Sequence, residues 1–83
     1  MTDEDARNNA LLLTARLAHL REESGFSKRK LAALAGLDPK AVTFIERGDR
    51  IPNLTTLLRL SDALGIRLSE EFRQLEEKEI DDE

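Results

Sequence analysis

The sequence has no cysteine, tryptophan or tyrosine, and only one histidine, His19. Without cysteine, neither a disulfide nor a thiolate metal site can stabilise the fold. A zinc site would have to be built almost wholly from carboxylates, so we expect no metal and no cofactor. The longest apolar runs are about four residues, against the ~20 that span a membrane, and no signal-peptide core is visible. These absences favour a soluble cytoplasmic protein without membrane contact.

Chain length limits the size of the core. A chain of 83 residues forms one small domain, and a domain of this size buries only about 60% of the surface of its unfolded chain. Small domains without disulfides often complete their core by oligomerising. Self-association is therefore expected.

The net charge of −4 conceals an uneven distribution. Residues 1–10 carry three acids and one base, residues 11–68 six acids and ten bases, and residues 69–83 eight acids and two bases. We therefore divide the chain into an N-terminal segment (1–10), a basic domain (11–75) and an acidic C-terminal tail (76–83). The tail is interpreted as frayed, solubilising chain, or as a segment that binds a basic protein partner.

Start and stop signals divide the chain into five short helices around one core, an all-α fold. Apolar residues recur at helical spacing nearly everywhere, and no stretch alternates with period two for long. The expected N-caps of the second to fifth helices are Ser27, Asp38, Asn53 and Ser69, and the expected stops of the first four are Gly25, Gly36, Gly48 and Gly65. Pro39, directly after Asp38, suits the first position of a helix.

Apolar stripes predict which face of each helix is buried. The stripes are Leu13, Leu17 and Leu20; Leu31, Ala32 and Ala35; Val42 and Ile45; and Leu54, Leu57, Leu58, Ser61 and Leu64. The fifth helix carries Phe72 and Leu75. Apolar residues continue past the fourth helix, so we expect a dimer interface there. Its expected residues are Ile66, Leu68, Phe72 and Leu75.

The second and third helices are joined by a very short, glycine-containing turn, which is typical of a helix-turn-helix unit. Lys40, Thr43, Phe44 and Arg47 are spaced i, i+3, i+4 and i+7, so they form the outward face of the third helix. A helix of about nine residues is some 13 Å long. That size suits the major groove of B-DNA.

Three cations, Lys28, Arg29 and Lys30, open the second helix. The positive end of the helix dipole disfavours cations there, so the cluster indicates an external anion such as a DNA phosphate. Arg47 and Arg50 could contact the backbone further along. The alternative is that these cations form an ordinary solvated face.

The stretch from Leu13 onward resembles the Cro/repressor-type helix-turn-helix family, also called the XRE family, over about residues 13–72. The residues that carry the resemblance are Arg16-Leu17, Leu20-Arg21, Gly25-Phe26-Ser27, Leu31-Ala32, Gly36, Ile45-Glu46-Arg47-Gly48, Pro52 and Leu64-Gly65-Ile66. The resemblance implies a five-helix, lambda-repressor-like domain. It further implies a homodimer that binds palindromic operator DNA and regulates transcription, as a repressor does.

The resemblance also assigns candidate residues. Its base-reading positions fall on Pro39, Lys40, Thr43 and Phe44, and its phosphate positions on Lys28, Arg47 and Arg50, to which the cation cluster adds Arg29. It pairs Arg21 with Glu46 in a structural ion pair. Pro39 can contribute only through its shape. Phe44 occupies a position where the family commonly has a polar residue that contacts a base. Phe44 could contact a thymine methyl group, or pack inside the domain or against another protein.

Two other functions stay open. One is an antitoxin-type regulator that also binds a toxin; the other is a protein-interaction module that has lost DNA binding. We expect no enzyme and no catalytic residue, because the outward side chains offer no nucleophile–base pair and no phosphate-cradling glycine loop.

Overall fold

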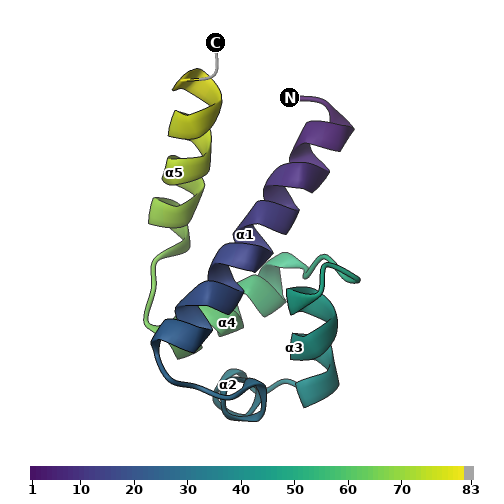
Figure 1. The fold of residues 1–83 in the computed structure, drawn as a ribbon, viewed down its shortest axis with the longest axis vertical. Helices are drawn as coiled ribbons and strands as arrows, with labels where there is room; N and C mark the ends of the chain where they lie inside the picture. The colour runs from purple at the N-terminus through teal and green to yellow at the C-terminus, as the bar shows by residue number, and fades with distance from the viewer. Residues whose placement is uncertain (82–83) are drawn as a thin grey trace.

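The computed structural model describes residues 1–81, with the side chains of residues 1–75, and contains five helices and no strand over that range. The helices are α1 (Asp3–Glu23), α2 (Lys28–Ala35), α3 (Pro39–Glu46), α4 (Leu54–Leu64) and α5 (Leu68–Asp81) (Figure 1). The all-α, five-helix prediction is confirmed. None of the helices in the described residues is long and apolar enough to cross a membrane.

Side-chain caps explain why three of the helices begin where they do. Ser27, Asp38 and Asn53 each accept a hydrogen bond from a backbone N–H two or three residues later. Such a bond satisfies one of the donors that a helix start leaves unpaired. At the other end, α2 and α4 stop at Gly36 and Gly65, whose φ angles of 69° and 68° are in the left-handed region. These boundaries agree with the sequence prediction.

The start of α1 lies earlier than the sequence suggested. Residues 3–10, expected as a separate N-terminal segment, form the beginning of this helix. Thr2 accepts a hydrogen bond from the Asp5 N–H, and the Asp5 carboxylate accepts one from the Thr2 N–H, each at 3.1 Å. The bond from the Thr2 backbone lowers the pKa of Asp5. This reciprocal cap holds the helix start.

The boundaries of α5 also differ from the prediction. The helix begins at Leu68 rather than after a Ser69 cap. The Arg67 carbonyl accepts hydrogen bonds from the N–H groups of Glu70 and Glu71. It continues to Asp81 instead of ending near Leu75, since glutamate and lysine are good helix formers. The side chains of residues 76–81, and residues 82–83 altogether, lie outside the described residues. The expectations for the acidic tail therefore stay predictions.

The core lies between α1, α2, α3 and α4. Its buried cluster consists of Leu17, Leu31, Ala32, Ala35, Val42, Ile45 and Leu60. The prediction for α4 was partly wrong, because Leu54 and Leu58 are 63% and 53% exposed while Leu60 is 3% exposed. The helix is turned so that Leu57, Leu60, Ser61 and Leu64 face inward, which is the alternative stripe at i, i+3, i+4 and i+7.

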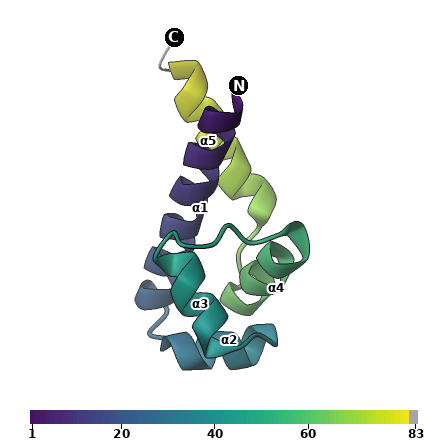
Figure 2. The same cartoon turned by 90° about the vertical axis from the view of Figure 1, so that its right-hand side faces the viewer.

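The helices place the candidate site at one end of the molecule. In both views α2 and α3 lie together at the end away from the two chain termini (Figures 1 and 2). The long α1 runs from the N-terminal end down to α2. The core thus presents α2 and α3 as one unit, away from α5.

Candidate nucleic-acid interface

The turn between α2 and α3 is fixed by the backbone. The Leu37 N–H donates to the Ala32 carbonyl at 2.8 Å, and the left-handed Gly36 between them makes this possible. Leu37 itself packs against the core. The two helices and their turn therefore form a rigid helix-turn-helix unit.

The structure brings the four base-reading candidates together on the outward face of α3. Val42 and Ile45 are buried on the opposite face. Pro39, Lys40, Thr43, Phe44 and Arg47 line one open hollow of about 380 Å³. A hollow bounded by side chains of a single helix face can receive the edge of a base.

Phe44 does not pack inside the domain. Its side chain is 37% exposed, and the Arg50 guanidinium carbon lies 5.3 Å from the centre of its ring. This is the distance of a cation–π contact. Arg50, on the loop after α3, is thereby held beside the outward face of α3. Sequence reasoning missed the contact, because the path of a loop decides whether two such residues meet.

The predicted phosphate residues are all exposed. Lys28 and Arg29 lie in the first turn of α2, and neither they nor Arg50 make an ion pair within the described residues. Arg47 lies 3.2 Å from Asp49, Nε to Oδ2, and both side chains are largely exposed. Such surface pairs contribute little and open readily. Four cations are thus available to an anion at the end of the molecule formed by α2 and α3.

Arg21 and Glu46 meet across the core between α1 and α3. Arg21 Nε and Nη2 donate to the two Glu46 carboxylate oxygens at 2.6 and 2.9 Å, and Nη1 donates to the Phe26 carbonyl at 2.7 Å. Arg21 is 8% exposed. The Glu46 carboxylate raises the pKa of Arg21, so the guanidinium stays charged. The pair joins the ends of two helices and points away from the outward face of α3.

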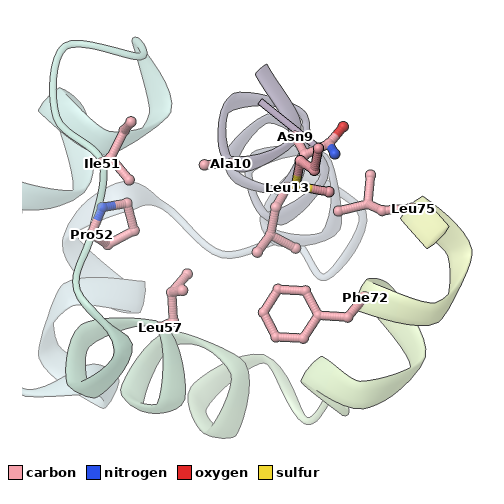
Figure 3. Close-up of a pocket in the computed structure, with 9 residues that line it drawn as sticks. Asn9, Ala10, Leu13, Ile51, Pro52, Leu57, Phe72 and Leu75 are labelled. Atoms are coloured by element: carbon pink, nitrogen blue, oxygen red, sulfur yellow. The ribbon is translucent and has the colours of Figure 1, made fainter. Parts of the chain in front are cut away.

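The four predicted dimer residues lie near the junction of α4 and α5. Ile66, Leu68 and Leu75 are half-buried and Phe72 is exposed. Phe72 and Leu75 also line an apolar pocket of about 350 Å³. Figure 3 shows these two side chains directed toward α1 and α4 of the same chain. Their packing is therefore partly internal, which the sequence pattern did not indicate.

The chain is similar in sequence to proteins named as transcriptional regulators. Residues 17–70 match the profile of the Helix-turn-helix family. The HTH-type transcriptional regulator PuuR of Escherichia coli K12 is 38% identical over 61 residues, which are 74% of this chain and 33% of PuuR. The uncharacterised HTH-type transcriptional regulator y4dJ of Sinorhizobium fredii is 34% identical over 55 residues, 66% of this chain and 71% of that protein. The chain spans about a third of the length of PuuR.

A solved structure has the same arrangement of helices. The restriction-modification controller protein C.AhdI from Aeromonas hydrophila superposes with a TM-score of 0.71 at 38% identity, over 77% of this chain and 97% of that chain. The matched residues include α2, the turn and α3. The chain therefore belongs to the helix-turn-helix family of the Cro/repressor, or XRE, type.

Proposed function

We propose that the protein is a sequence-specific, DNA-binding transcriptional regulator that places α3 in a major groove. The observation that carries the proposal is the convergence of Pro39, Lys40, Thr43 and Phe44 on one outward hollow of that helix. Relatives named as HTH-type transcriptional regulators support it. C.AhdI, titled a restriction-modification controller protein, supports it as well.

The size of α3 fits this role. Its 8 residues make a helix about 12 Å long, and the major groove is about 12 Å wide. In a helix-turn-helix unit the first residues of the recognition helix reach the base edges. Lys40 is the second residue of α3 and is exposed, so its ammonium group can donate to guanine O6 and N7. Pro39, without an N–H, contributes shape alone.

The cations supply the sequence-independent part of binding. Lys28 and Arg29 lie at the start of α2, where the helix dipole adds to their attraction for a phosphate. Arg47 and Arg50 follow the end of α3. We assign all four to phosphates, which fixes the register of α3 in the groove without reading sequence.

The proposed contact between Lys40 and a guanine can be tested directly. Lys40→Ala is expected to relax the base preference at one symmetric pair of operator positions, with a discrimination loss of about 1–3 kcal/mol for the guanine contacted. Selection of bound duplexes from a random DNA pool, repeated with wild type and variant, measures this. Arg29→Ala serves as the control, because a lost phosphate contact weakens all sequences alike. An unchanged selected sequence in Lys40→Ala would contradict the assigned role.

We further propose a homodimer that binds a palindromic operator through two α3 helices about 34 Å apart, one turn of DNA. Exposed Phe72, beside half-buried Ile66 and Leu68, supports an interface near the start of α5.

Sedimentation velocity at tens of micromolar is expected to give about twice the 9.4 kDa chain mass. Phe72→Asp is expected to give a monomer with unchanged helix content, because a carboxylate in an apolar interface loses its hydration. Leu34 is an exposed leucine on α2, and Leu34→Asp is the control that should stay dimeric. A wild-type monomer at these concentrations would rule the dimer out.

A further inference from the structure

The hollow on α3 is lined by both apolar and cationic side chains. Pro39 and Phe44 bring apolar rings, and the Thr43 hydroxyl donates to the Pro39 carbonyl at 3.3 Å, so its proton is used within the helix. Lys40 and Arg47 complete the lining. A base edge that enters this hollow therefore meets both apolar surface and cations.

Arg50 gives the Phe44 ring a defined position. Its guanidinium carbon is 5.3 Å from the ring centre, which covers one side of the ring. Arg50 makes no ion pair within the part of the chain that the structure describes, so its N–H groups remain available to a phosphate. If Arg50 contacts a phosphate, it therefore also holds the Phe44 ring against a nearby base.

The major groove offers few apolar groups to such a ring. Guanine, adenine and cytosine present hydrogen-bond donors and acceptors, and thymine adds the methyl group on C5. A methyl group on C5 of cytosine occupies the same place. We propose that Phe44, positioned by Arg50, reads the 5-methyl group of a pyrimidine, so that the protein prefers thymine and 5-methylcytosine to cytosine at that position. This inference rests on the DNA binding proposed above and names the chemical group that α3 recognises.

Deoxyuridine isolates the methyl group, because it differs from thymidine only there. In the selected duplex, each thymine of a half-site and its symmetry mate are replaced by 2′-deoxyuridine, and binding is followed by fluorescence anisotropy. At one symmetric pair of positions we expect about fourfold weaker binding per methyl group removed, or about 15-fold for the pair, from the transfer free energy of one buried methyl. At that pair, 5-methylcytosine is expected to bind about fourfold per position more tightly than cytosine.

Variants identify the residue that reads the methyl group. The measured quantity is the ratio of the affinity for the thymine duplex to that for the deoxyuridine duplex. In Phe44→Ala this ratio is expected to fall to about one, while Phe44→Leu should keep part of the preference. Arg50→Gln, which removes the charge and retains a polar chain, should reduce the ratio and also weaken binding. Lys28→Ala is the matched control: binding weakens but the ratio stays at its wild-type value. Each ratio is measured within one variant, so a general loss of affinity does not affect it.

The outcomes separate the two proposals. If wild type binds the selected duplex with an affinity that deoxyuridine changes at no position and that is equal for cytosine and 5-methylcytosine, the proposed reading of the methyl group is wrong. The proposed DNA binding then stands. If Phe44→Ala keeps the wild-type ratio, another residue reads the methyl group and the role of Phe44 is overturned. If the folded protein binds no DNA, the proposed function itself fails.

Discussion

Replacing Glu46 with alanine is expected to lower the free energy of unfolding by about 3–5 kcal/mol, the usual cost of removing one partner of a buried ion pair. Arg21 is 8% exposed, and the change would leave its guanidinium with the Phe26 carbonyl and the exposed Glu22 carboxylate 3.7 Å away. In a domain of this size each kcal/mol shifts the melting temperature by about 4–8 °C. Thermal unfolding followed by circular dichroism should therefore show a decrease of at least about 12 °C.

An exposed carboxylate on α1, the helix that carries Arg21, serves as the control. Glu23 lies 2.8 Å from His19, Oε1 to Nε2, and both side chains are more than half exposed. Glu23→Ala removes the same carboxylate chemistry at the surface, so a change within about 0.5 kcal/mol is expected. Equal melting temperatures for Glu46→Ala and wild type would show that the Arg21 pair does not stabilise the domain. Folded Glu46→Ala should retain the DNA sequence preference, because its side chain is turned away from the outward face of α3.

The double variant Lys28→Ala/Arg29→Ala is expected to lose most of its DNA affinity and none of its stability. Four phosphate contacts per subunit give a dimer a slope of log K against log salt of about −7, and removing two per subunit leaves about −4. Between 50 and 200 mM salt the affinity of wild type should then fall about 10⁴-fold, and that of the variant about 10²-fold. The melting temperature should be unchanged or higher, since both cations face the positive end of the α2 dipole.

A cation at the opposite end of the molecule provides the comparison. Arg7 is exposed near the N-terminal end of α1. That end of the helix lies away from α2 and α3 (Figure 1). Arg7→Ala should leave the salt slope as in wild type. If the double variant and Arg7→Ala have the same slope, the first turn of α2 does not contact phosphates.

Local signals in the sequence predicted most of the fold. Ser27, Asp38 and Asn53 are caps whose short side chains compete for backbone N–H groups, and that chemistry depends on neighbouring residues alone. The stripe of α4 was harder to predict. Leu58 continues a helical stripe with Leu54 and Ser61, and Leu60 continues one with Leu57 and Leu64. Only packing against α2 and the rest of the core decides which stripe is buried.

The sequence predicted which residues share the outward face of α3, and the family resemblance predicted the contact between Arg21 and Glu46. Most other contacts of these residues were not predicted. Spacing places Lys40 and Phe44 on one face of a helix wherever that helix lies. Their surroundings depend on segments distant in sequence or irregular in path, such as the loop that carries Arg50 over the Phe44 ring. Glu71, buried against Arg16 at 3.4 Å, shows the same limit, since a glutamate is ordinarily exposed and no periodic pattern indicated otherwise.

The most direct test of the account is the affinity of the folded protein for its selected duplex and for a scrambled duplex of equal length, measured by anisotropy from 50 to 200 mM salt. We predict that at physiological salt the selected duplex is bound at least about 10³-fold more tightly, and that log K falls against log salt with a slope of about −7. Equal affinity for both duplexes, or no binding while circular dichroism shows intact helices, would contradict the account and favour a protein-interaction module on this scaffold.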